Sequence, residues 1–297
     1  MSTINNRHNI FFCLDENYIP CLKYVLNSFI KCNKPHKYNI HFIITLDKLT
    51  FDEFKNIIIT VADKVSKNFN LVIKEFVPPI ELVELVNGYC KILDKRYPTN
   101  AKCAKGTFIN IGNWSRFYIS YLFPDVKTGL YLDLDILFNG NIEEIFSIDF
   151  GDNVIGAIND TTTHKKHTFE KSYDRFIAIF DVELMNKLKI KQEDYNRISY
   201  NCGVMYINFE LYRERNFLNI LLDILKHTIK HNIVQFRGTQ GILHIIAPNY
   251  TLLPNKFNVI TKRKYELAEA SILHFKGISK FWDNHNYREL YNKFMCK

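Results

Sequence analysis

Strand-like and helix-like segments alternate along the first half of this chain, and the alternation restricts its fold more than any other feature. Four short apolar segments predict strands, at residues 9–14, 38–46, 71–76 and 129–138. Between them, apolar side chains recur at helical spacing, over residues 18–30, 50–61, 80–96 and 113–124. This order predicts an α/β fold with a mostly parallel central sheet and helices on both of its faces.

The second half continues the pattern without a visible boundary. It predicts strands at residues 153–159 and 201–209, a helix at 210–231 and a short helix at 239–246. Because no Gly/Ser linker or change of composition separates the halves, we expect one domain over residues 1–297. Its parts are an α/β half at about 9–150, a second half at about 151–282 and a tail at 283–297.

Cysteine usage and hydropathy exclude several classes of protein. The seven cysteines are scattered without a CxxC spacing, which argues against a zinc or redox motif and favours a reducing compartment. No apolar run approaches the roughly 18 residues of a transmembrane helix. Residues 1–9 also lack the pattern of a signal peptide, so we expect a cytoplasmic protein.

The net charge of +8 arises from 39 Lys and Arg against 31 Asp and Glu, and the basic residues are spread along the chain. Nucleic-acid-binding proteins usually gather such residues into one stripe, so we expect no nucleic-acid partner. A modest excess suits an anionic small substrate such as a nucleotide, or an anionic lipid surface, equally well. It is also compatible with a soluble surface that has no charged partner.

Several nucleotide-binding and hydrolase motifs are absent from the sequence. No GxG occurs and no glycine precedes a lysine, which excludes the dinucleotide fingerprint and the GxxxxGK phosphate loop. The GxSxG and HExxH motifs are also missing, which argues against serine hydrolases and zinc peptidases. A metal held by carboxylates at a strand end remains as the candidate chemistry.

Two aspartates, Asp133 and Asp135, interrupt an otherwise apolar segment, YLDLDIL at residues 131–137. Buried carboxylates are costly unless they are paired or bind a metal. At this spacing in a strand both side chains lie on one face, and at the carboxyl end of a parallel sheet that face opens into the ligand crevice. The pair predicts a Mg²⁺ or Mn²⁺ site that holds a diphosphate. The alternative is a strand end that exposes both acids to solvent.

Residues 131–138 and 141–146 together resemble the metal-binding segment of glycosyltransferase family 8. These retaining UDP-sugar transferases include glycogenin and bacterial lipooligosaccharide galactosyltransferases. Three more segments resemble family motifs in the same order, DENY at 15–18, NCGVMYIN at 201–208 and HFKGISKFW at 274–282. The resemblance spans about residues 9–282. It implies a Rossmann-like nucleotide-diphospho-sugar transferase fold (GT-A type), whose first half binds the nucleotide and whose second half binds donor sugar and acceptor.

The resemblance implies a metal and diphosphate site. Asp133, Asp135 and His274 bind Mn²⁺ in this interpretation, and Mg²⁺ is a substitute for it. Gly277 and Lys280 hold the diphosphate, together with Asp133. On the residues alone, His274 in its apolar strand also fits a hydrogen-bonded core histidine.

The DENY segment resembles the uracil-binding loop of the family. The resemblance implies that Asp15 and Asn17 hydrogen-bond the uracil while Tyr18 stacks on it. The same residues equally fit an Asx turn that leads into a helix.

A further group of residues is expected around the donor sugar. The resemblance places Arg116 against the donor sugar or phosphate, and Asp160 and Asn201 on the sugar and acceptor side. Gln240 matches the family and, with Asp135 and Arg116, is expected to take part in catalysis. Thr239 stands where an aspartate is usual, which puts donor choice and activity in question. For Arg116, a surface arginine with a buried stem is the alternative.

These features together predict metal-dependent, retaining transfer of a hexose, glucose or galactose, from a UDP-sugar to a hydroxyl of a glycan, lipid or protein. Self-glycosylation is a variant, and contact with a membrane surface or homodimerisation stays open. A catalytically weakened binder of UDP-sugar or glycan is the main alternative, motivated by Thr239. A sugar-1-phosphate nucleotidyltransferase fits less well, because residues 8–20 contain no glycine for a phosphate loop.

Overall fold

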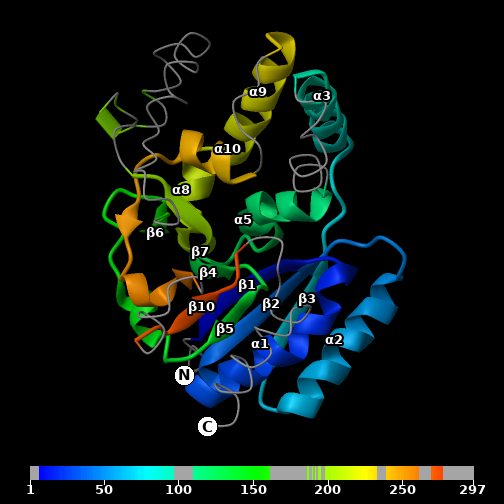
Figure 1. Cartoon of the computed structure of the whole chain (residues 1–297), viewed down its shortest axis with the longest axis vertical. Coiled ribbons are helices and arrows are strands. Elements are labelled where there is room, and N and C mark those ends of the chain that lie inside the picture. The colour runs from blue at the N-terminus through cyan, green and yellow to red at the C-terminus, as the bar shows by residue number, and fades with distance from the viewer. Residues whose placement is uncertain are drawn as a thin grey trace.

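The computed structural model describes residues 7–96, 110–160, 198–232, 239–260 and 269–276, with single positions at 186, 189, 191, 193 and 194. These residues form an α/β fold around a seven-stranded sheet of order β3-β2-β1-β4-β7-β6-β8 (Figure 1). The pairings are parallel except those of β7, which runs antiparallel to both of its neighbours. The strands are β1 His8–Leu14, β2 Tyr38–Ile44, β3 Asn70–Glu75, β4 Thr128–Leu132, β6 Ile155–Asn159, β7 Tyr200–Asn208 and β8 Thr251–Leu252.

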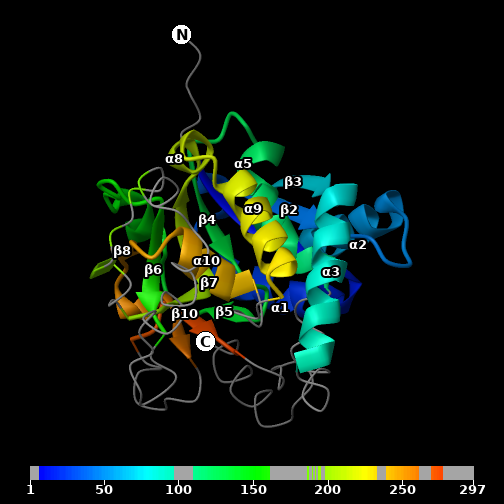
Figure 2. The same ribbon diagram turned by 90° about the horizontal axis from the view of Figure 1, so that it is seen from above.

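Helices cover both faces of the sheet, as predicted. Alternate residues of β1 enter two separate hydrophobic clusters, Phe11 on one face and Ile10 and Phe12 on the other, because strand side chains alternate. The helices α1 and α2 pack on the second face, and α3 and α9 lie side by side on the first (Figure 2). The helices are α1 Ile19–Cys32, α2 Phe51–Val65, α3 Ile80–Arg96, α5 Ile119–Leu122, α8 Phe209–Glu214, α9 Phe217–Lys230 and α10 Thr239–Ile246.

The predicted start of α2 is confirmed in atomic detail. The Glu53 backbone N–H donates to Thr50 Oγ1 at 3.3 Å, and the Thr50 N–H donates to Glu53 Oε2 at 2.8 Å. This capping box satisfies N–H groups that the first helical turn leaves unpaired. The bounds of α3 and α10 also agree with the prediction.

Two predicted helices are wrong in detail. The segment predicted as a helix at 113–124 is mostly a 3₁₀ helix, η3 Ile111–Tyr118, followed by the single turn of α5. The long helix predicted at 210–231 is divided into α8 and α9 at Asn216, whose φ of 56° is left-handed. Asparagine tolerates this conformation better than most residues, so the helix can turn there.

The single strand predicted at 129–138 is also wrong. The chain leaves the large sheet after β4 and enters a second sheet of order β5-β10-β9, formed by β5 Ile136–Phe138, β10 Ile272–His274 and β9 Val259–Ile260. The Asp133 N–H donates to the Gly203 carbonyl at 2.8 Å, whereas the Asp135 carbonyl accepts from the Phe275 N–H at 2.8 Å. The backbone therefore changes partners between the two aspartates.

None of the five cysteines that the structure describes, Cys13, Cys21, Cys32, Cys90 and Cys202, forms a disulfide. Within the described ranges, no helix combines the length and the apolar character that crossing a bilayer requires.

A buried histidine in β2 predicts acid sensitivity of the fold. The His41 ring stacks on Phe11 with centroids 4.3 Å apart, and its Nε2 lies 2.9 Å from Asn9 Oδ1. Burial, with a smaller contribution from Lys74, lowers the pKa of His41 from 6.5 to about 4. Between these values the unfolded chain binds a proton that the folded chain does not. Stability is therefore lost as the pH falls from about 6.5 to 4, by about 2–3 kcal/mol for this group.

We expect His41→Phe to reduce this pH dependence, because phenylalanine keeps the ring contacts and cannot titrate. The free energy of unfolding in urea, measured between pH 7.5 and pH 4, checks this. Exposed His36 offers the matched control, and His36→Gln should keep the wild-type slope. Equal slopes in His41→Phe and wild type would contradict the prediction.

Candidate metal and nucleotide site

The predicted metal ligands meet where the two sheets join. Asp133 and Asp135 lie between β4 and β5, and His274 ends β10, opposite Ile136 of β5. One ligand atom from each of these three residues lies within 4.8 Å of the other two, and His274 Nε2 is 3.2 Å from Asp135 Oδ1. Asp135 and His274 are 5% and 2% exposed. Two carboxylates and an imidazole are ligands suited to Mn²⁺ or Mg²⁺, so these residues fit a divalent cation.

A chain of hydrogen bonds fixes the orientation of His274. The Gly203 backbone N–H donates to Asn201 Oδ1 at 2.9 Å, which identifies that atom as the amide oxygen. Asn258 Nδ2 donates to the same oxygen at 2.8 Å, so Asn258 Oδ1 accepts from His274 Nδ1 at 2.9 Å. His274 Nδ1 therefore donates this hydrogen bond, and Nε2 is the ring nitrogen that lies against Asp135.

This chain gives Asn201 a structural position that the sequence did not indicate. Asn201 and Asn258 are both buried, and neither was predicted to orient His274. The expected contact of Asn201 with sugar or acceptor stays a prediction.

Asp133 is held on one side by Tyr131 and Arg116. The Tyr131 hydroxyl donates to Asp133 Oδ1 at 2.6 Å, and Arg116 Nη2 lies 3.5 Å from the same oxygen. Burial raises the pKa of Tyr131, so its hydroxyl keeps the proton that it donates. The Arg116 guanidinium stacks 4.8 Å from the Tyr131 ring centre, and its side chain is largely buried. Arg116 is therefore not a surface arginine, and it contacts Asp133 through Oδ1.

Gly203 is a site residue that the sequence reasoning did not assign. A Cβ built on Gly203 would lie 2.3 Å from His274 Cε1 and 2.9 Å from Asp133 Oδ2. Any side chain would therefore displace two of the three predicted ligands. A glycine inside a buried strand often marks such a close approach, and that signal was present in the NCGV sequence.

The predicted uracil-binding loop lies beside the three ligands. Asp15 Oδ1 accepts from the Asn17 N–H at 2.9 Å, which confirms the Asx turn, and Asp15 Oδ2 accepts from Asn110 Nδ2 at 2.7 Å. Burial raises the pKa of Tyr18, and the charges of Asp133, Asp135 and Asp15 raise it further. Asn110, which no motif indicated, ties this loop to η3.

Asp160 follows β6 and, of the other residues expected at the sugar side, contacts Gln240. Lys276 Nζ donates to Asp160 Oδ2 at 2.7 Å, and Gln240 Nε2 lies 3.4 Å from the same oxygen. Gln240 Oε1 accepts from the Cys202 N–H at 3.3 Å, and buried Thr239 begins α10 beside it. Lys276 was not predicted. The predicted diphosphate residues Gly277 and Lys280 lie outside the described residues.

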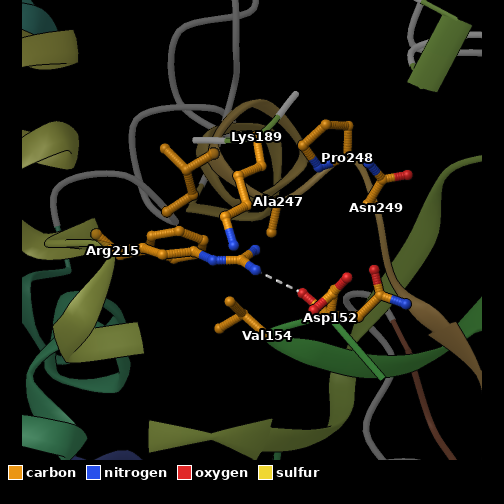
Figure 3. A pocket seen from close by; sticks show the side chains of 10 residues that line it. Asp152, Val154, Lys189, Arg215, Ala247, Pro248 and Asn249 are labelled. Atoms are coloured by element: carbon orange, nitrogen blue, oxygen red, sulfur yellow. Dashed lines mark hydrogen bonds between the residues drawn. The ribbon is translucent and has the colours of Figure 1, made fainter. Parts of the chain in front are cut away.

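A separate pocket lies at the opposite end of β6 (Figure 3). Asp152 and Val154 line it just before β6 begins, whereas Asp160 follows the end of that strand. Arg215 Nη2 donates across it to the Asp152 carbonyl at 2.7 Å. Its volume of about 50 Å³ is far below the roughly 300–1,000 Å³ of drug-sized ligand pockets. None of the predicted site residues that the structure describes lines this pocket.

Comparison with known proteins decides the family. The model of glycosyl transferase family 8 matches residues 9–286. The chain belongs to glycosyl transferase family 8. The resemblance carried by the four sequence motifs is therefore confirmed over the full range for which it was predicted.

Relatives of this family 8 chain come from bacteria and plants. It is 24% identical to a lipopolysaccharide 1,2-glucosyltransferase of Escherichia coli, over 96% of this chain and 78% of the relative. It is also 24% identical to a putative glycosyltransferase of Haemophilus influenzae, over 92% and 72% of the two chains. Probable galacturonosyltransferase 14 of Arabidopsis thaliana is 22% identical over 94% of this chain. The chain spans about half of that plant protein, 56% of its length.

Solved structures confirm the predicted GT-A-like fold of the family 8 chain. The galactosyltransferase LgtC, in complex with donor and acceptor sugar analogues, superposes with a TM-score of 0.61. The match has 17% identity and covers 97% of this chain and 95% of LgtC. An active-site mutant of LgtC gives a TM-score of 0.65 at 16% identity, over 96% and 94% of the two chains.

Proposed function

We propose that this protein transfers a hexose, glucose or galactose, from a UDP-sugar to a hydroxyl of a glycan, lipid or protein acceptor, with retention at the anomeric carbon. The observation that carries the proposal is the meeting of Asp133, Asp135 and His274 beside the Tyr18 loop, at the carboxyl end of β1 and β4. Relatives named for glucosyl and galactosyl transfer to lipopolysaccharide support the choice of hexose.

Each residue has a role in this proposal. Asp133, Asp135 and His274 hold Mn²⁺, or Mg²⁺ in its place. When bound, the cation offsets the negative charge of the departing UDP. Asn258 keeps the His274 lone pair directed at the metal position. We place Gly277 and Lys280 at the diphosphate, as the family motif implies.

The reaction fits a displacement on one face of the sugar. The bond from the anomeric carbon to the β-phosphate oxygen breaks, the acceptor oxygen bonds to the same face, and the departing phosphate takes the acceptor proton. Gln240 supports the positive charge that develops on the sugar ring, and Arg116 acts through its contact with Asp133. Asp160 is engaged by Lys276 and Gln240, which disfavours a role as a covalent nucleophile.

Asp15, Asn17 and Tyr18 bind the uracil in this proposal, and Tyr18→Ala tests the stacking. We expect the affinity for UDP to fall roughly 5- to 150-fold, because aromatic stacking contributes about 1–3 kcal/mol per base. Isothermal titration of UDP in the presence of Mn²⁺ measures this. Tyr18→Phe keeps the ring and should retain most of the affinity. Equal losses in both variants would show that the hydroxyl, rather than the ring, binds the base.

The direct test of the function is UDP release from a panel of UDP-sugars with Mn²⁺, without added acceptor, alongside the intact mass of the protein. Turnover of one donor identifies the sugar, and a mass increase in hexose steps identifies self-glycosylation. No binding of UDP at all would refute the proposal.

A catalytically weakened binder is the second candidate, motivated by Thr239 at the start of α10. Binding of UDP-sugar without transfer, even to a range of acceptors, would favour it. Thr239→Asp then restores the usual family residue, and a gain of turnover in that variant would identify Thr239 as the cause.

A further inference from the structure

Lys276 lies at the sugar side of the site, and the proposed mechanism gives it no role toward the substrate. It follows the metal ligand His274 by two residues, and its Nζ lies 2.7 Å from Asp160 Oδ2. The Asp160 side chain is 12% exposed and the Lys276 side chain 35% exposed. The ion pair is therefore anchored on a largely buried carboxylate, and about a third of the lysine side chain is exposed.

The pair is tied to the strand that also borders the metal ligands. Gln240 lies 3.4 Å from Asp160 Oδ2 and accepts from the Cys202 N–H, and Cys202 directly precedes Gly203 of β7. The Gly203 carbonyl in turn accepts from the Asp133 N–H at 2.8 Å. Through β7, and through His274 two residues before Lys276, the Asp160–Lys276 pair is therefore adjacent to the metal position.

This position constrains what Lys276 can contact. A glycosyl group is joined to its diphosphate through a single oxygen, so a sugar whose diphosphate lies at the metal position must be next to it. Sugar hydroxyls both donate and accept hydrogen bonds, whereas a carboxylate only accepts and an ammonium only donates. An ammonium has three N–H groups, and the bond to Asp160 uses one of them.

We infer that Asp160 and Lys276 together hydrogen-bond two neighbouring hydroxyls of the donor hexose. The carboxylate accepts from one hydroxyl, and the ammonium donates to the next. The inference rests on the proposed function and adds a specificity-determining residue to it. A hexose with one of these hydroxyls inverted breaks one of the two contacts. Lys276 thereby contributes to the choice between donors that differ at a single carbon.

The test compares Lys276→Met, which keeps a long side chain without donors, with Lys276→Arg, which keeps charge and donors. Lys127→Met is the matched control, because Lys127 also forms an ion pair, with Glu210, and both side chains are exposed. Lys127 directly precedes β4, so it lies at the opposite end of that strand from Asp133. Each variant is assayed for affinity toward UDP, UDP-glucose and UDP-galactose with Mn²⁺, and for kcat/KM with both donors. Thermal unfolding checks that each variant is folded.

We expect Lys276→Met to bind UDP like the wild type, because UDP lacks the sugar. Its kcat/KM for the preferred donor should fall roughly 10- to 150-fold, as expected for loss of a hydrogen bond to a charged group. The ratio of kcat/KM between UDP-glucose and UDP-galactose should move toward one. Lys276→Arg should recover part of the wild-type ratio.

Two results would overturn the inference while leaving the proposed function intact. One is that Lys276→Met keeps the wild-type kcat/KM and the wild-type ratio of kcat/KM between the two donors. The other is that its affinity for UDP falls as much as its affinity for the UDP-sugars, which would place Lys276 at the diphosphate. If wild-type protein neither binds UDP nor uses either donor, the proposed function itself fails, and the inference fails with it.

Discussion

Asp135→Ala is expected to remove nearly all turnover, by roughly 1,000-fold or more, while the chain stays folded. Asp135 is 5% exposed and lies 3.2 Å from His274 Nε2, so it is placed to share a cation with that nitrogen. Turnover is lost because the two remaining ligands bind the cation more weakly than three do. Turnover of the preferred UDP-sugar measures the effect directly.

Thermal unfolding separates loss of metal from loss of fold. A ligand that binds only the folded state raises its unfolding temperature. Mn²⁺ should therefore stabilise the wild type and fail to stabilise Asp135→Ala. The metal-free stability of this variant should not fall, because the substitution removes one of two neighbouring carboxylates that repel each other. Exposed Asp223 on α9 provides the control, and Asp223→Ala should behave as wild type. A folded Asp135→Ala protein that kept most of its activity would show that the site is assigned incorrectly.

Gly203→Ala is expected to reduce turnover about as much as Asp135→Ala, although Gly203 carries no functional group. The new Cβ would lie 2.3 Å from His274 Cε1, closer than real Cβ atoms approach other atoms. His274 and Asp133 must then separate, which dismantles the metal site. We expect Mn²⁺ binding, measured by calorimetry, and UDP-sugar turnover to be lost together.

Gly88→Ala is the matched control for Gly203→Ala. A Cβ at Gly88 would lie 3.1 Å from the end of the Ile229 side chain, which can shift, and α3 is remote in sequence from the three ligands. This variant should keep its metal affinity. Wild-type Mn²⁺ affinity in Gly203→Ala would contradict the close packing on which the prediction depends.

The sequence predicted elements whose signals are local. The Thr50 and Glu53 capping box lies within one helical turn, and the apolar spacing of α3 lies within one helix, so both could be assigned from neighbouring residues alone. The break at Asn216 could not be assigned in this way, because it depends on one residue adopting a left-handed conformation between two apolar stretches.

The division of the predicted strand at residues 129–138 depends on distant partners. Asp133 bonds to Gly203, and Asp135 bonds to Phe275, some 140 positions later in the sequence. No pattern within the YLDLDIL segment contains this information. The two aspartates still meet His274, but they do so at a crossing between sheets rather than on one face of a strand.

Within the site, ligand types were easier to predict than supporting contacts. Asp133 and Asp135 were proposed as ligands because carboxylates interrupt an apolar segment, and His274 because its segment resembles a family motif. Asn258 and Asn110 lie in stretches of the sequence where an asparagine carries no distinguishing pattern. Their roles depend on which atoms they face, and the folded chain alone determines that.

The crossing between sheets has a consequence for how the protein would lose its function under stress. β5, β10 and β9 have two or three residues each, whereas β1 and β2 have seven. Short ladders open more readily than long ones, so the small sheet can detach while the large sheet persists. Asp133 would then stay with one part and His274 leave with the other. Inactivation and unfolding are in that case two separate events, and the first precedes the second.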